Sequence, residues 1–190
     1  MTDMATNPNV LPANIPAPRD DGAARHLAGM ALPDITLPAT RGPAINLSKL
    51  KGRAVIYIYP RTGVPGVANP DGWDMIPGAR GCTPQSCSFR DHAGELKALG
   101  VNQLLGLSTQ DTAYQREAAE RLHLPFPVLS DERLELTKAM KLPTFVASGM
   151  TLLKRMAWVA DDDKITKVFY PVFPPDKNAE EVIAWLRSSC

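Results

Sequence analysis

Two cysteines close together in the chain, Cys82 and Cys87, are the residues with the clearest chemical potential. A thiol attacks as the thiolate, so a reactive cysteine needs positive potential nearby and some access to solvent. Arg80 lies two residues before Cys82, and Thr83 followed by Pro84 is typical of the first turn of a helix. Unpaired backbone N–H groups at such a helix start stabilise an anion. Cys82 is therefore the candidate nucleophile.

Cys87 falls inside the same predicted helix, which runs from Thr83 to Leu99 and ends at Gly100. Residues five apart in an intact helix have Cα atoms about 8 to 9 Å apart. That separation is more than a disulfide spans, so a bond between Cys82 and Cys87 requires the backbone to move. Four residues separate the pair, whereas a thioredoxin-type reductase has two.

Other interpretations of the cysteines remain open. A lone cysteine on a helix is most often an inert core residue, which is the plainer interpretation of Cys87. Zinc binding is an alternative, but the three histidines show no ligand spacing to the pair, and we expect no metal or bound cofactor. The third cysteine, Cys190, is interpreted as an incidental thiol.

The segments around the cysteines alternate between strand and helix patterns, which predicts an α/β fold with a thioredoxin-like layout and a central mixed sheet flanked by helices. Residues 54–59 form a continuous apolar run typical of a fully buried strand. Further strands are expected at 103–107, 126–129, 155–160 and 165–169, and further helices at 112–122, 133–141 and 179–187.

Two segments depart from this alternation. Residues 1–30 are rich in Pro, Asn, Asp and Ala and predict a mobile or loosely packed arm, which leaves residues 31–190 as one domain. Residues 61–81 form a loop with many Pro and Gly, and loops of this length are usually functional or disordered. Trp73 in this loop either covers the active site or anchors the loop.

Composition narrows the classes of function. The 190 residues, 44% of them hydrophobic, suffice for one well-packed domain. Because 21 basic residues balance 20 acidic ones, neither nucleic acid nor an anionic membrane is an expected partner. The sequence contains no long apolar run and its first ten residues lack the layout of a secretory signal, which predicts a cytoplasmic location.

Five motifs in order, YIYP, GCTPQSCSFRDH, LLGLSTQD, FPVLSDE and RMAWVADDDKI, resemble the peroxiredoxins of the Q type, also called bacterioferritin comigratory proteins. The resemblance extends from about Leu32 to Leu186. It implies that Cys82 is peroxidatic and that Cys87 is resolving. It also implies that Arg155, which opens a predicted strand, stands beside the active site, although a surface ion pair is its plainer interpretation.

The chain departs from the family pattern at one position. The family has a Thr or Ser three residues before the peroxidatic cysteine, preceded by a Pro, and here that position is Ala79. The inserted loop has split the motif. Thr62 could supply the hydroxyl, Pro77 could replace the proline, or Arg80 could stabilise the thiolate.

The resemblance implies a thiol peroxidase that reduces hydrogen peroxide and small organic hydroperoxides. Its partner would be thioredoxin or a similar dithiol reductant, and we expect a monomer or a homodimer. Two other functions remain open, a redox sensor that passes its disulfide to a client, and a thioredoxin-fold binding or holdase module without efficient turnover.

Overall fold

A five-stranded mixed sheet forms the centre of the computed structural model, which describes residues 7–189. The central strand β3 (Arg53–Ile58) is parallel to β4 (Val101–Ser108) and antiparallel to β8 (Met156–Asp161). The full order is β5-β4-β3-β8-β9, with β5 (Val128–Ser130) and β9 (Lys164–Phe169) at the edges. This is the α/β architecture that the strand and helix patterns predict.

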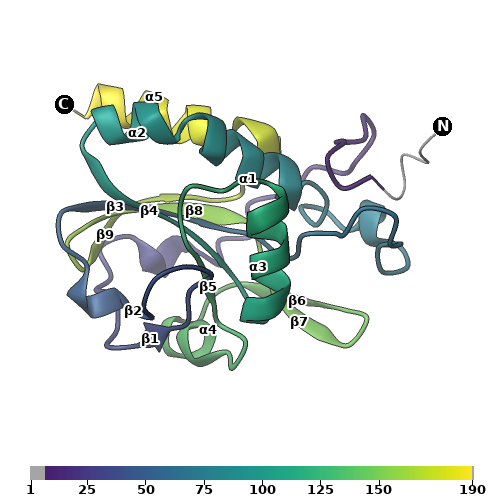
Figure 1. Cartoon of the computed structure of the whole chain (residues 1–190), viewed down its shortest axis with the longest axis horizontal. Helices are drawn as coiled ribbons and strands as arrows, with labels where there is room; N and C mark the ends of the chain where they lie inside the picture. Colours follow the sequence, from purple (N-terminus) through teal and green to yellow (C-terminus); the bar gives the residue numbers. More distant parts are fainter. Residues whose placement is uncertain (1–6, 190) are drawn as a thin grey trace.

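Alternation along β3 divides the core into two halves. Val55 and Tyr57 face one half, whereas Ala54, Ile56 and Ile58 face the other, and all five are buried. Three helices cover the Tyr57 face, as Figure 1 shows above the sheet: α1 (Cys82–Asp91), α2 (Ala93–Ala98) and α5 (Asn178–Ser188).

Smaller elements cover the opposite face and the ends of the sheet. The hairpin of β1 (Thr36–Leu37) and β2 (Ile45–Asn46) and the helix α4 (Glu135–Met140) lie below the sheet in Figure 1. The helix α3 (Thr112–Arg121) lies beside β5, and a separate hairpin is made by β6 (Thr144–Ala147) and β7 (Met150–Leu153). Within residues 7–189, no helix combines the length and the apolar character that a bilayer crossing requires.

The predicted long helix after Cys82 is two helices in the structure. The first begins at Cys82 itself, because Gly81 adopts φ 103° as the N-cap, and it ends at Asp91. The second starts after His92, whose backbone is not helical. The prediction was therefore one residue late at the start and missed the break at His92.

The N-terminal segment is packed rather than loose where the structure describes it. Ala24 and Leu27 are buried in the core below the sheet, and the Gly29 N–H donates to the Ile165 carbonyl. Nearer the start, the carbonyls of Asn7 and Val10 accept hydrogen bonds from Arg80. The expectation of a loosely packed arm is therefore wrong for these residues, while residues 1–6 lie outside the described part of the chain.

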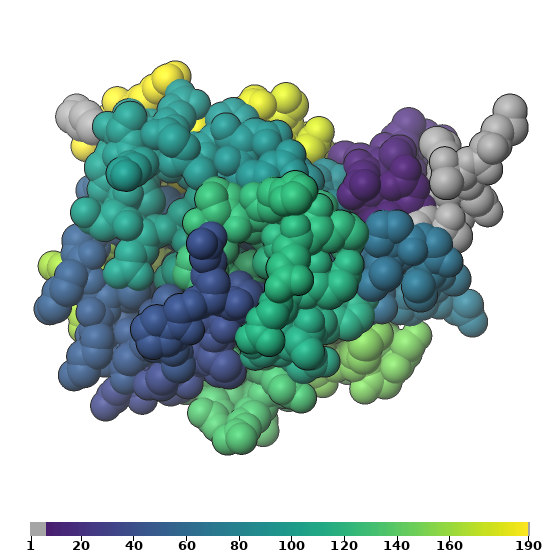
Figure 2. Space-filling model, viewed as in Figure 1, coloured from purple at the N-terminus to yellow at the C-terminus, as the bar shows by residue number. Residues whose placement is uncertain are grey.

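The inserted loop, residues 61–81, is anchored by Trp73. This side chain is 3% exposed and packs with Ala79 and Leu152 in a small apolar cluster, with its ring 6.2 Å from that of Phe145. Of the two roles open for Trp73, the structure supports the anchor. Figure 2 shows the N-terminal segment (purple) and this loop (blue) side by side at one end of the molecule.

Candidate active site

The Cys82 thiol is buried at the start of α1, where three groups contact its sulfur. It is 3% exposed. Arg155 Nη2 lies 3.2 Å from Sγ, and the backbone N–H of Arg61 donates to Sγ from 3.4 Å. As a thiol, Cys82 donates in turn to the Ala79 carbonyl at 3.5 Å. Two donors, one of them cationic, are thus in place to stabilise the sulfur once it carries a negative charge.

Arg155 is held in place by a set of acceptors around its guanidinium. Nη2 donates to the carbonyls of residues 78–80 at 3.0 to 3.2 Å, and Nη1 donates to Gln85 Oε1 at 2.5 Å. The side chain is 3% exposed, so the surface ion pair considered for it is wrong. Arg155 lies just before β8 rather than within it, in the turn that follows β7.

Gln85 is a site residue that the sequence did not single out. It is fully buried one turn after Cys82 in α1, and its Nε2 donates to Asn178 Oδ1 at 2.9 Å. Asn178 is also fully buried, at the first residue of α5. Gln85 therefore ties Arg155 to α5. The sequence did contain a signal for Gln85, because it is a polar residue one turn after Cys82 on a helix that packs against the sheet.

The contacts described for the Cys82 sulfur come neither from Thr62 nor from the Arg80 side chain, two of the groups considered in place of the missing family hydroxyl. Thr62 is buried, but its hydroxyl donates to Gln110 Oε1 at 3.2 Å. The Arg80 guanidinium donates to Asp74 and to backbone carbonyls of the N-terminal segment, so it ties the inserted loop to that segment. Contact to the sulfur comes instead from the backbone of Arg61, the third residue after β3 ends.

Cys87 lies in the second turn of α1, half-buried against the core above the sheet. Both it and Cys82 are free thiols, and the intact helix keeps their Cα atoms about 8 to 9 Å apart. Burial raises the pKa of the Cys87 thiol, an effect that the nearby Arg90 opposes. The structure thus shows a reduced state in which the two sulfurs are kept apart.

Within residues 7–189, no group of three or more His, Cys, Asp and Glu side chains is placed to hold a metal ion. Cys190 lies outside the described residues.

Comparison with known proteins places this site in a family. The Redoxin family model matches residues 27–183. Peroxiredoxin Q of Oryza sativa subsp. japonica, named as chloroplastic, is 33% identical over 162 residues, which cover 84% of this chain and 66% of that protein. Peroxiredoxin Q of Populus jackii, also chloroplastic, is 32% identical over 162 residues, covering 84% of this chain and 68% of its own length.

A solved structure agrees with the sequence comparison. Peroxidoxin BcpB from Mycobacterium tuberculosis superposes with a TM-score of 0.67 at 27% identity, covering 85% of this chain and 96% of that one. The resemblance read from the five motifs and the thioredoxin-like fold expected from it are both confirmed. The chain belongs to the Redoxin family and, within it, to the peroxiredoxins of the Q type.

Proposed function

We propose that this chain is a thiol-dependent peroxidase in which Cys82 is the peroxidatic and Cys87 the resolving cysteine. The observation that carries the proposal is the Arg155 guanidinium 3.2 Å from the Cys82 sulfur, in a site with a second donor from the Arg61 backbone. A buried sulfur with two donors directed at it is arranged for a negative charge rather than for inert packing.

The chemistry follows from this arrangement. The Cys82 thiolate attacks one oxygen of the hydroperoxide, so that an S–O bond forms as the O–O bond breaks. The leaving oxygen takes a proton and departs as water or an alcohol, and Arg155 stabilises the charge that develops on it. Cys82 is now a sulfenic acid. Its condensation with the Cys87 thiol forms the disulfide and releases water.

A dithiol protein of the thioredoxin type then reduces the disulfide by thiol exchange, which oxidises that protein and returns both cysteines of this chain to thiols. The substrates proposed are hydrogen peroxide and small organic hydroperoxides. The assembly as a monomer or a homodimer and the cytoplasmic location stay predictions.

The decisive experiment is peroxide consumption coupled to thioredoxin and its reductase, with the parent, Cys82→Ser and Cys87→Ser. We expect turnover by the parent alone. Cys87→Ser should still form one sulfenic acid per chain, trapped by dimedone and seen by mass spectrometry, whereas Cys82→Ser should form none. Full turnover by Cys82→Ser would refute the assignment. A parent that forms the disulfide but does not turn over would favour the redox-sensor alternative.

A further inference from the structure

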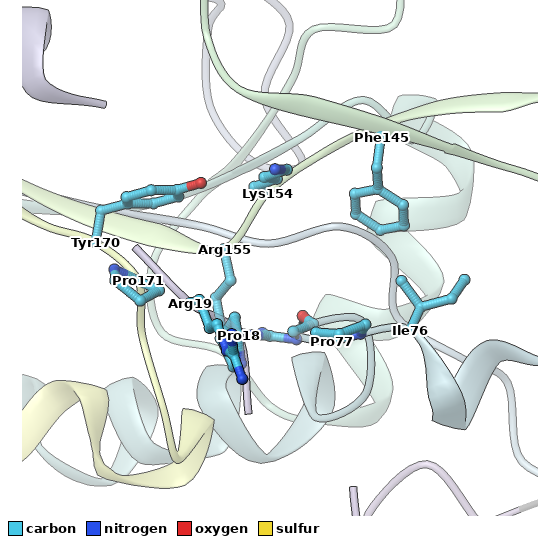
Figure 3. A pocket seen from close by; sticks show the side chains of 10 residues that line it. Pro18, Arg19, Ile76, Pro77, Phe145, Lys154, Arg155, Tyr170 and Pro171 are labelled. Carbon is cyan, nitrogen blue, oxygen red and sulfur yellow. Dashed lines mark hydrogen bonds between the residues drawn. The ribbon is translucent and has the colours of Figure 1, made fainter. Parts of the chain in front are cut away.

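A cavity of about 270 Å³ lies next to the site, with Arg155 in its lining. It is formed where the N-terminal segment and the inserted loop meet the β6 hairpin and the end of β9. Figure 3 shows Phe145 and Ile76 on one side of it and Tyr170 and Pro171 on the other, with Lys154 between them. The walls are thus mostly apolar, and the cavity is slightly smaller than the range of about 300 to 1,000 Å³ that is usual for ligand sites.

The polar groups of this cavity are three cationic side chains and the Tyr170 hydroxyl, which donates to Asp21. Its lining includes Arg19, Lys154 and Arg155, and none of its lining residues within the described chain is acidic. Asp21, which is not a lining residue, forms an ion pair with Lys154 at 2.6 Å. Arg19 is exposed at the rim. A positive rim with apolar walls complements a molecule that has an apolar body and an anionic end.

Arg155 supplies a second, independent indication of a ligand. Arg155 is 3% exposed and lines the cavity, and its Nε–H, which is itself enclosed by the surrounding atoms, has no hydrogen-bond partner among the described residues. Buried polar groups in folded proteins are nearly always paired. The guanidinium has also no carboxylate among the partners described for it, which are an amide, three carbonyls and the Cys82 sulfur.

We propose that this cavity binds a small organic carboxylate, with a medium-length alkyl chain or a single ring as its apolar body. The carboxylate is attracted by the positive charges of Arg155 and Arg19. The apolar body packs against Ile76 and Phe145. The N-terminal segment and the inserted loop build the site, so the part of the chain that splits the family motif has a binding role.

Binding at this cavity is coupled to Cys82 because one guanidinium serves both. An anion on Arg155 lowers the positive potential that the Cys82 sulfur experiences, and therefore disfavours the thiolate. Linkage is reciprocal, so the carboxylate binds more tightly when the sulfur carries no charge. The consequence for the peroxide step rests on the proposed function, whereas the binding itself does not.

Calorimetric titration of the full chain with octanoate tests the site. Saturable binding is expected for octanoate, and binding at least tenfold weaker is expected for octan-1-ol, which lacks the charge, and for acetate, which lacks the chain. Ile76→Glu places an anion in the cavity and should weaken octanoate binding at least tenfold. Met75→Glu, at a neighbouring side chain that is 72% exposed, is the matched control and should bind as the parent does.

Arg19→Gln gives a second test that leaves the core untouched. It should weaken octanoate binding about threefold, while Arg133→Gln, at an exposed arginine elsewhere, should not. Equal affinity for octanoate and octan-1-ol, or unchanged octanoate binding by both Ile76→Glu and Arg19→Gln, would overturn the proposal.

The coupling is measured on a chain in which Cys87 and Cys190 are replaced by Ser, so that iodoacetamide alkylates Cys82 alone. Saturating octanoate should slow this alkylation about threefold, and Cys82→Ser should bind octanoate about threefold more tightly than the reduced parent at pH 8. Octanoate binding without any effect on alkylation would overturn the coupling. If the parent binds octanoate but shows no peroxidase turnover, the proposed function is refuted, whereas the binding site in the cavity is supported.

Discussion

At the scale of single residues, the chemistry proposed for Cys82 depends on where Arg155 is held. Burial of an arginine without a carboxylate partner is costly, and here five polar contacts, three of them to carbonyls of the inserted loop, offset that cost. Because those carbonyls come from residues 78–80, the loop places the cation that the sulfur requires.

Two variants should distinguish the effect of the Arg155 charge on the rate from the effect of its position. Arg155→Ala removes the donor to the sulfur, and we expect the second-order rate of sulfenic acid formation to fall at least a hundredfold, in line with the loss of one oxyanion donor. Gln85→Ala leaves the charge but loosens its position, so a smaller fall of about tenfold is expected. Stopped-flow fluorescence with hydrogen peroxide gives both rates. A rate unchanged by Arg155→Ala would show that the contact at 3.2 Å has no role in catalysis.

At the scale of elements, most of the sheet could be predicted because its strands are apolar runs bounded by Pro, Gly and charged turns. Residues 54–59 are an example, since the observed β3 differs by one residue at each end. The hairpin of β6 and β7 was missed because each of its strands has only four residues, too few for a period to stand out.

The site could be predicted in part for a similar reason. Cys82, Cys87 and Arg155 were singled out because the motifs of the family are retained around them; the structure brings Cys82 and Arg155 together, and the catalytic roles of all three stay predictions. The Arg61 backbone was not found, because a backbone contact to a sulfur 21 residues away leaves no mark in local spacing. Gln85 was not singled out either, although its place one turn after Cys82 was a signal, because its partner Arg155 is 70 residues away. The closeness of residues 7–10 to Arg80 was missed on the same grounds.

The start of α1 should unwind when the disulfide forms. The gap of about 8 to 9 Å between the two cysteine Cα atoms must close to less than about 7 Å. Amide hydrogen exchange of the oxidised protein should show lost protection across residues 83–90, with protection retained across β3, which is buried in the centre of the sheet. The reduced Cys87→Ser variant is the control. Full protection of residues 83–90 in the disulfide form would contradict this mechanism.

At the scale of the whole molecule, the N-terminal segment is fastened to the body by a polar cluster. The Asp21 carboxylate accepts from Lys154 Nζ at 2.6 Å and from the Tyr170 hydroxyl at 2.7 Å. These hydrogen bonds lower the pKa of Asp21, the contact to Lys154 most strongly. Because a lowered pKa in the folded state favours the ionised form, this contribution to stability is present above the unfolded pKa of about 3.9 and is lost at lower pH.

Asp21→Asn should therefore lower the melting temperature at pH 7 by up to about 3 °C, the size expected for an exposed ion pair in a domain of this length. The difference from the parent should shrink as the pH falls below about 4. Scanning calorimetry at several pH values measures both effects. Asp71→Asn, on an exposed part of the inserted loop, is the control. A difference that is the same at pH 3 and pH 7 would exclude the carboxylate as its cause.

The packing around Gly81 has a further consequence for the fate of the enzyme under heavy oxidant load. A side chain at this position would collide with Pro175 and Leu11, so the start of α1 is wedged between the segment before α5 and the N-terminal segment. Unwinding α1 has to displace both. With Cys87 as the resolving cysteine, as proposed, we expect this wedge to delay the reaction of Cys87 with the sulfenic acid. Meanwhile a second peroxide molecule can oxidise the sulfenic acid to the sulfinic acid, which thiols do not reverse.

We therefore expect the wedge to set the ratio of two competing reactions of the sulfenic acid, disulfide formation with Cys87 and irreversible oxidation to the sulfinic acid. Leu11→Ala should loosen it, speed disulfide formation, and lower the fraction of chains lost to sulfinic acid per turnover. Intact-mass spectrometry after turnover at millimolar peroxide measures that fraction. Val10→Ala, which also removes methyl groups at the neighbouring position, is the control variant. An equal fraction in Leu11→Ala and the parent would mean that the wedge opens faster than a second peroxide arrives.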